Sequence, residues 1–279
     1  MTKERTVART VSAMPTSDGA GVNLKRSIGA PMLDQLDPFL LLDNIESDAA
    51  ADYIAGFPEH PHRGFETVTY MIEGRMRHRD SNGGEGLLES GGAQWMTAGR
   101  GVLHSEMPEQ EDGRLHGFQL WVNLPAARKM IPSRYQDIPA AQIPEVNLDG
   151  AGLVRIVAGT FQGATGPVSG IDSDPLYVDV ELSDGGATTV PIAAGHTAFV
   201  YVFAGTLKVG ERTIAADTLA VLSDGDAVTL TGGADGGGRA LVVAGKPFNE
   251  PIARYGPFVM NTREEIYQAV EDFQAGRLA

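Results

Sequence analysis

The sequence predicts an all-β fold of two antiparallel sandwich or barrel domains that ends in a short helix. Short apolar runs recur between clusters of Gly, Asp, Asn and Pro, and 35 of the 279 residues are glycines. Short strands with tight turns about every 8–12 residues are typical of β-sandwiches and β-barrels. Two stretches, one in each half, resemble each other, and helical periodicity is nearly absent before residue 262.

Two stretches in the first half of the chain are expected to form strands. In HPHRGFETVTYMIEG (60–74), apolar and polar residues alternate, so Val68, Tyr70 and Ile72 share the face that we expect to point inward. GRGVLHSE (99–106) is the second stretch. Both contain polar residues at alternate positions, which is the pattern that places side chains on one side of a strand.

The second half repeats part of this pattern. Setting Gly74 against Gly205 places Phe199, Tyr201 and Phe203 at the positions of the three apolar residues named above. GDAVTL (225–230) likewise matches GRGVLH (99–104). We infer a duplicated β module.

A boundary between two domains is expected near residue 130. The stretch LPAARKMIPSRYQDIPAAQIPEV (124–146) is rich in proline and poor in periodicity, which indicates a linker. We therefore expect an N-terminal domain over residues 1–130 and a C-terminal domain over residues 131–279.

The end of the chain is predicted to be helical over residues 263–275. Thr262 is a suitable N-cap, and Glu265 three residues later completes a capping box. An apolar stripe that would cover a β domain follows, and a glycine at 276 ends the pattern. The stripe consists of Ile266, Val270 and Phe273.

Composition and charge exclude several kinds of site. The chain has no cysteine, so disulfides, thiolate metal ligands and thiol nucleophiles are excluded. Its formal charge of -14 and its pI near 4.8 oppose contact with a phosphate backbone, so we expect no direct nucleic-acid binding. No apolar run is long enough to span a bilayer, and residues 1–19 lack the apolar stretch of a secretory signal. We therefore expect a soluble, cytoplasmic protein without a membrane partner.

Four side chains in the first half form a candidate metal site. Residues i and i+2 of a strand point to the same side, so His60 and His62 present both imidazoles on one face. His104 and Glu106 have the same spacing. Two such pairs facing each other supply nitrogen and oxygen ligands that suit Fe(II), Mn, Ni, Cu or Zn, whereas Ca²⁺ and Mg²⁺ prefer oxygen almost throughout. Four ligands on a six-coordinate ion leave positions open for a substrate or dioxygen.

The second module lacks these ligands. Under the two alignments given above, the four candidate positions are occupied by residues that do not coordinate metals through their side chains: Pro191, Ala193, Leu230 and Gly232. Loss of every coordinating group together favours a metal-binding module in the first half and a degenerate module without metal in the second.

The other polar candidates have structural interpretations. His78 lies in RHRDSNGG (77–84), which indicates a solvated turn. His116 begins HGFQLWVN, where a buried, hydrogen-bonded imidazole is favoured over a fifth ligand. Gln119 lies on the other side of that strand with Trp121 and could orient a metal ligand. His196, in the second module, is expected to be structural.

Four motifs in order make the sequence similar to one known family. HPHRGFETVTYMIEG and GRGVLHSE resemble the first and second motifs of the cupin superfamily. With QWMTAGRGVLHSEMP (94–108), GFQLWVNLP (117–125) and GPFVMNTREEIYQAV (256–270), they resemble the pirin family of two-domain cupins, from about Arg26 to the C-terminus. The resemblance implies a bicupin of two jelly-roll domains.

The resemblance also implies the metal and its ligands. Pirins bind one metal, usually iron, in the N-terminal cupin through three histidines and a glutamate, which correspond here to His60, His62, His104 and Glu106. Many other cupins take the glutamate from the first motif, which here is Glu66 and lies on the same face as His62 if the strand stays regular. The pirin pattern favours Glu106, with Glu66 as a structural or supporting carboxylate.

Two activities follow from the family resemblance. Some pirins resemble quercetinases, which open the heterocycle of a flavonol with dioxygen and release carbon monoxide, and Glu106 would then be the catalytic base. Other pirins are regulators that bind a transcription factor or a metabolic enzyme, with the redox state of iron as the signal. Because a two-domain chain can satisfy the β-edge pairing of cupins internally, we expect a monomer.

Overall fold

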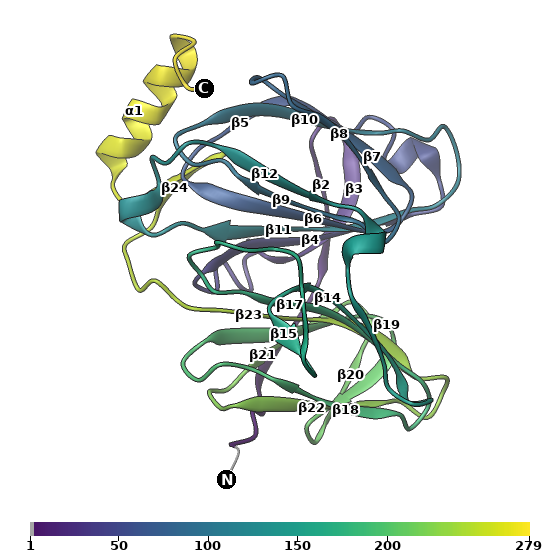
Figure 1. Ribbon diagram of the computed structural model, residues 1–279. Coiled ribbons are helices and arrows are strands. Elements are labelled where there is room, and N and C mark those ends of the chain that lie inside the picture. Colours follow the sequence, from purple (N-terminus) through teal and green to yellow (C-terminus); the bar gives the residue numbers. More distant parts are fainter. Residues whose placement is uncertain (1–2) are drawn as a thin grey trace. The chain divides into compact units, whose positions relative to one another are not determined.

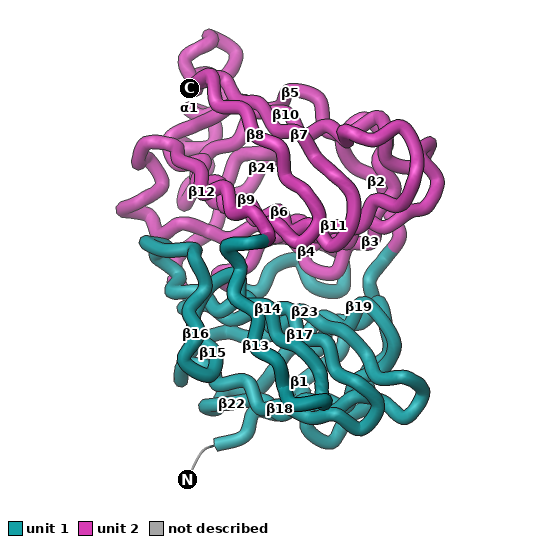
Figure 2. Tube along the Cα trace, turned by 45° about the vertical axis from the view of Figure 1, so that its right-hand side comes forward, with its two compact units in different colours: residues 1–14, 31–36, 141–247 teal, residues 15–30, 37–140, 248–279 magenta. Residues whose placement is uncertain are grey.

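The computed structural model describes residues 3–279, which form two compact units built from discontinuous segments (Figure 2). Unit 1 contains residues 3–14, 31–36 and 141–247. Unit 2 contains residues 15–30, 37–140 and 248–279. The chain therefore leaves unit 2 between Ala140 and Ala141, and its final segment, with the helix, belongs to unit 2. The division into one metal-binding half and one metal-free half at residue 130 stays a prediction.

Unit 2 contains two antiparallel sheets (Figure 1). The larger has seven strands in the order β12 (Arg134–Ile138), β9 (Ala93–Thr97), β6 (Phe65–Glu73), β11 (Leu115–Asn123), β4 (Phe39–Ser47), β3 (Val22–Ile28) and β2 (Met14–Asp18). The smaller has four strands in the order β5 (Phe57–His62), β10 (Val102–Pro108), β7 (Arg75–Asp80) and β8 (Glu85–Glu89). The hairpin β24 (Ala253–Tyr255) and β25 (Phe258–Met260) and the helix α1 (Arg263–Gln274) complete the unit, with the short 3-10 turns Ala50–Asp52 and Ala126–Arg128.

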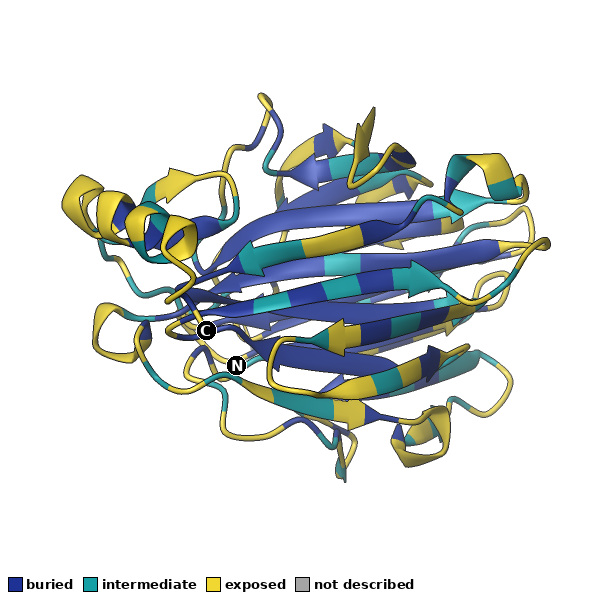
Figure 3. Ribbon diagram, turned by 90° about the horizontal axis from the view of Figure 1, so that it is seen from above, coloured by how far each residue is buried: buried dark blue, intermediate teal, exposed yellow. Residues whose placement is uncertain are grey.

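The two sheets of unit 2 share an apolar core, which makes the unit a β-sandwich. Strands β3, β4, β6 and β11 contribute Val22, Leu24, Ile45, Met71 and Leu115 to this core, and β5, β7 and β8 contribute Phe57, Met76 and Leu88. Burial of apolar side chains between two sheets is the main force that holds such a sandwich together. Figure 3 shows buried residues, in dark blue, along many of the strands of the protein.

Unit 1 is a second β structure with its own core. Its main sheet runs in the order β1 (Val7–Ser12), β21 (Thr218–Leu222), β19 (Thr197–Val209), β23 (Gly238–Gly245), β17 (Leu176–Leu182), β14 (Gly152–Ala158) and β13 (Glu145–Asn147). The strands β18 (Ala187–Pro191), β20 (Arg212–Ala215) and β22 (Ala227–Gly232) branch from it, and β15 (Thr160–Phe161) pairs with β16 (Ala164–Thr165). A 3-10 turn, Ala140–Gln142, lies where the chain enters the unit. Antiparallel strands with one short helix near the C-terminus confirm the predicted all-β fold.

The predicted helix is confirmed to within one residue. The Thr262 hydroxyl accepts the Glu265 N–H, and the Glu265 carboxylate accepts the Thr262 N–H, so the capping box is formed. Ile266 and Ala269 are buried against the hairpin, whereas Phe273 is 40% exposed. No helix within residues 3–279 is long and apolar enough to cross a membrane.

The stretch from residue 124 to 146 is only in part a linker. Arg134–Ile138 forms β12, which pairs with β9 at the edge of the seven-stranded sheet. Pro132 and Pro139 flank this strand without interrupting it, which is where an edge strand tolerates proline. Proline content alone therefore gave a wrong interpretation for this segment.

Candidate metal centre

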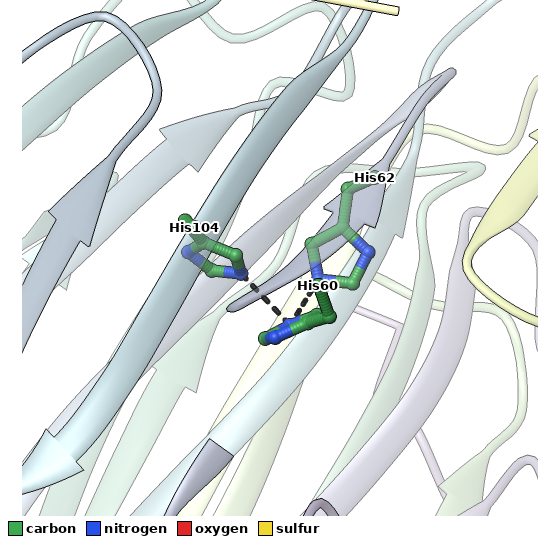
Figure 4. A group of neighbouring side chains, drawn as sticks. All are labelled: His60, His62 and His104. Atoms are coloured by element: carbon green, nitrogen blue, oxygen red, sulfur yellow. Dashed lines mark hydrogen bonds between the residues drawn. The ribbon is translucent and has the colours of Figure 1, made fainter. Parts of the chain in front are cut away.

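Three imidazoles converge in unit 2 (Figure 4). His60 and His62 lie two residues apart on β5, and His104 of β10 is directly opposite His60 in the antiparallel pair. The Nε2 atom of His60 is 3.0 Å from Nε2 of His62 and 3.0 Å from Nε2 of His104. One potential ligand atom from each ring lies within 4.8 Å of the other two. Alternation along one strand and register with the next therefore bring the three histidines together, as the sequence predicts.

The hydrogen bonds and burial of the three rings suit a metal site. Nδ1 of His60 is 2.8 Å from the Pro58 carbonyl, which can only accept, so the neutral ring has its proton on Nδ1 and its lone pair on Nε2. Burial, with the neighbouring imidazoles, lowers the pKa of His62 well below its ordinary value. Burial also lowers the pKa of His104 to about 4, against the opposing charge of Glu106. Neutral imidazoles are the form that binds transition metals.

Glu106 lies two residues after His104 on β10 and is held by two donors from the seven-stranded sheet. It is buried, and its Oε1 accepts the Thr69 hydroxyl at 3.0 Å while Oε2 accepts the Gln119 side-chain amide at 2.7 Å. The β5–β10 register shifts between His104 and Glu106, because Glu106 is opposite Phe57 and β5 carries an extra residue there. Glu106 is not part of the compact imidazole group, so its place as a ligand stays a prediction.

Glu66, the alternative carboxylate, belongs to a different sheet from His62. β5 ends at His62 and β6 begins at Phe65, with Gly64 between them at a positive φ of 89°. The strand is therefore not regular, and the parity that would place Glu66 beside His62 does not apply. The Glu66 carboxylate is buried and accepts the Thr97 hydroxyl at 2.6 Å.

The histidines are surrounded by aromatic rings and open onto a cavity. The His62 ring is 5.0 Å from Phe65 and 5.3 Å from Trp121, both edge-on, and the Arg254 guanidinium lies 4.9 Å above Trp121. A cavity of about 580 Å³ within unit 2 is lined by His60, His62, Gln119, Trp121 and Arg254, among others. This volume is in the range that accommodates a small organic molecule.

The prediction for His78 is wrong. His78 is buried on β7, its ring stacks on Tyr135 at 5.4 Å, and its Nε2 is 3.3 Å from Asp137. The polar turn begins only at residue 81, and the alternation of Met76, His78 and Asp80 faces His78 inward. Cross-strand pairing with Glu106 places it on the same side of the sheet as the site.

The remaining histidines lie outside the imidazole group. His116 is buried, with its ring 5.3 Å from Phe118. His196 belongs to unit 1, where its Nε2 is 3.8 Å from Asp174. Neither lies among the three imidazoles that converge on one point.

Comparisons with known proteins identify the family. The family models described as Pirin and as Pirin C-terminal cupin domain match residues 21–122 and 177–279. A pirin-like protein of Caulobacter vibrioides is 48% identical over 274 residues, which cover 98% of this chain and 99% of that protein. The chain belongs to the pirin family. The human pirin is 40% identical over 279 residues, covering 98% of this chain and 94% of the human protein.

A solved structure confirms the pirin-type fold. The crystal structure described as quercetin 2,3-dioxygenase from Acinetobacter baumannii has a TM-score of 0.90 and 36% sequence identity, and the match covers 99% of both chains. The family resemblance and the two-domain cupin fold expected from the motifs are therefore confirmed. The pirin fold implies a metal cofactor at the three histidines.

Sequence reasoning missed Thr69 and gave the wrong orientation for β6. The alternation of Val68, Tyr70 and Ile72 was expected to mark the inward face, but Thr69, on the opposite face, contacts Glu106. Val68 and Thr69 are both buried, because both faces of this central strand are covered. The signal that could have found Thr69 is the polar alternation Thr67, Thr69 within an otherwise apolar strand.

Proposed function

We propose that His60, His62, His104 and Glu106 bind one transition-metal ion, with Fe(II) as the native metal. The proposal is supported by three imidazoles, two of them buried, whose Nε2 atoms approach one another, because buried ring nitrogens are costly unless a partner such as a metal ion satisfies them. A site of three nitrogens and one carboxylate suits iron, while Mn, Ni, Cu and Zn fit the same ligands. Cellular supply decides among these metals.

We further propose a flavonol 2,3-dioxygenase-type reaction with quercetin as substrate and dioxygen as co-substrate. The similarity to the Acinetobacter protein and the cavity beside the imidazoles support it. The bound metal would supply Lewis acidity and a path for electrons between flavonol and dioxygen. The chain's own residues bind and orient the flavonol, whose heterocycle opens with uptake of dioxygen and release of carbon monoxide.

Glu106 and Trp121 have distinct roles in this proposal. Glu106 accepts the proton of the flavonol 3-hydroxyl on a carboxylate oxygen and is the catalytic base. Trp121 lines the cavity beside His62, and its indole, with the Arg254 guanidinium 4.9 Å from the ring, forms part of the wall that the flavonol rings contact.

The test is an assay for turnover in air. The protein is purified, loaded with Fe(II) and mixed with quercetin, and the loss of flavonol absorbance is followed together with carbon monoxide release. The matched control is His62→Ala, which removes one imidazole. Turnover no faster than that of the His62→Ala variant would exclude the dioxygenase function.

A second candidate function is iron-dependent binding of a protein partner, such as a transcription factor or a metabolic enzyme. The observation that favours it is a groove of about 710 Å³ between the β24–β25 hairpin and α1, where Tyr255 and Tyr267 are each 67% exposed. Exposed aromatic residues are enriched at protein interfaces. A pull-down with the Fe(II) and Fe(III) forms would support this function if one partner is retained by only one form.

A further inference from the structure

We propose that Gln119 is a positioning residue that holds the Glu106 carboxylate and, at the same time, the Trp121 ring that packs beside His62. The inference rests on the proposed metal site and adds to it a residue of the seven-stranded sheet. Glu106 lies on β10 and His62 on β5, both in the four-stranded sheet, whereas Gln119 lies on β11 of the facing sheet. One amide thus connects the two sheets at the site.

The orientation of the Gln119 amide is fixed by the chemistry of its two neighbours. The carboxylate of Glu106 accepts hydrogen bonds, so the Gln119 nitrogen faces Oε2, at 2.7 Å. The indole of Trp121 can only donate, and its Nε1 faces the Gln119 oxygen at 3.4 Å. Both hydrogen bonds therefore require the same orientation of the Gln119 amide. The bond to the carboxylate is short and charge-assisted and is the stronger of the two.

The hydrogen bond between Gln119 and Trp121 links Gln119 to His62. The Trp121 ring packs edge-on against the His62 imidazole at 5.3 Å and lies tilted against Phe65 at 4.4 Å. Gln119 therefore touches Glu106 directly and supports His62 through Trp121. Supporting groups of this kind set the orientation of metal ligands and typically affect metal affinity about 10–100-fold when they are removed.

Gln119 differs from Thr69, the other donor to Glu106, in its access to the cavity. Thr69 is buried and is not part of the cavity wall, whereas Gln119 is partly exposed and lines the cavity. A ligand in the cavity can therefore reach the Gln119 amide, which lines the wall, and compete with Glu106 for it. Entry of a substrate would loosen Glu106 from one of its two donors and leave it held by Thr69.

The test uses the full chain with Co(II) and with Fe(II) under anaerobic conditions. Gln119→Met keeps the length of the side chain and removes both hydrogen bonds, and Trp121→Phe keeps an aromatic side chain but removes the indole N–H and part of the ring surface. The matched control is Gln94→Met, because Gln94 donates to Asp137 at 2.7 Å and has no bond to Glu106. Dissociation constants are measured by competition with a chromophoric chelator, and the visible spectrum of the Co(II) protein reports the ligand set.

We expect Gln119→Met to weaken metal binding about 10–100-fold and to alter the Co(II) spectrum. Trp121→Phe is expected to have a smaller effect, and Gln94→Met to retain the wild-type constant and spectrum even if it unfolds at a lower temperature. A Gln119→Met protein with wild-type affinity and spectrum overturns this inference alone. A wild-type protein that binds neither metal overturns both the inference and the proposed function.

Discussion

At the scale of single residues, the site depends on strand parity and on where that parity breaks. His60, His62 and His104 are brought together because β5 and β10 are extended and paired at these positions. Glu66 is removed from the same face by the break at Gly64 between β5 and β6. Parity can be applied to a sequence only where the strand is known to be continuous.

Matched substitutions of Glu106 and Glu66 distinguish which of the two carboxylates binds the metal. We expect Glu106→Gln to reduce bound iron strongly and Glu66→Gln to retain it, because Glu106 follows His104 on the same strand while Glu66 lies in the facing sheet. Metal content per chain is measured by plasma mass spectrometry. Loss of iron only in Glu66→Gln would show that the ligand is Glu66.

The grouping of the three histidines and a supporting place for Gln119 could be predicted from sequence, but most of the surroundings of the site could not. HxH and HxE spacings place side chains on one face of a strand, which a sequence reveals directly. The donors to Glu106 come from β6 and β11, whose position opposite β10 depends on how the sheets pack. The burial of His78 was missed for the same reason, since RHRDSNGG is polar throughout and the stacking of Tyr135 on the ring depends on how the strands pack.

At the scale of elements, a buried lysine ties three segments of unit 2 together. Lys129 is 1% exposed, and its ammonium donates to the Gly64 carbonyl and the Asn123 side chain, each at 2.7 Å, and to the Val259 carbonyl at 3.0 Å. These oxygens lie before β6, at the end of β11 and in β25. One side chain thus connects the sheet to the C-terminal hairpin.

We expect Lys129→Met to lower the free energy of unfolding by about 2–4 kcal/mol at pH 7, because three buried oxygens lose their donor and the relief of charge burial offsets only part of that cost. Urea denaturation measures the change, followed by tryptophan fluorescence for unit 2 and by circular dichroism for both units. The exposed Lys208→Met in unit 1 is the control, and it should alter stability by less than about 0.5 kcal/mol. Equal stability of wild type and Lys129→Met would show that the three bonds do not stabilise the unit.

The same lysine gives stability a defined dependence on pH. Burial lowers the pKa of Lys129 to about 8 from its ordinary value of 10.5. Between these values the unfolded chain binds more protons than the folded chain, so the wild type gains stability as the pH rises. The difference in the free energy of unfolding between wild type and Lys129→Met should therefore increase by up to about 3 kcal/mol from pH 8 to 10.5. A difference that stays constant or decreases over this range would contradict the prediction.

An ion pair at the end of β5, the strand that carries His60 and His62, anchors the helix α1. Arg63 follows His62, is buried, and donates to Asp272 of α1 at 2.8 Å and to the Arg100 carbonyl. The Arg63 bond lowers the pKa of Asp272, so its contribution is present above the ordinary value of 3.8 and is lost as the pH falls through the lowered value. The capping box and the apolar stripe could be read from the sequence, but not this ion pair.

We expect Asp272→Asn to lower the free energy of unfolding by about 1–3 kcal/mol, because the buried guanidinium loses its counter-charge. The neighbouring Glu271→Gln is the control, since its side chain is exposed. Thermal unfolding of both variants measures the difference. Identical melting temperatures for the two variants would mean that the ion pair does not anchor the helix.

At the scale of the whole molecule, each unit is completed by a segment from the opposite end of the chain. Unit 1 contains residues 3–14 together with 141–247, and unit 2 contains residues 248–279 together with 37–140. The proline-rich stretch and the repeated motifs predicted two β modules, but not this exchange of end segments. Short edge elements such as β1 and the β24–β25 hairpin carry too little pattern to reveal their partners in a sequence.

Removal of residues 248–279 is expected to unfold unit 2 and leave unit 1 folded. Unit 2 would lose the Val259 oxygen bound by Lys129 and the Asp272 partner of Arg63. Both tryptophans, Trp95 and Trp121, lie in unit 2, so their fluorescence reports on it alone. We expect red-shifted tryptophan emission and no bound metal, with part of the β signal in circular dichroism retained. Native emission and bound metal in the shortened chain would refute this.

The exchange of end segments also sets an order during synthesis on the ribosome. The strands that carry the three imidazoles emerge early, but the hairpin and helix that complete their unit are translated after residue 247. Unit 1, whose final residue is 247, has all of its sequence available sooner. The unit whose strands are made first is therefore the one whose sequence is completed second, and its histidines lie in an incomplete sandwich until the hairpin and helix have been made.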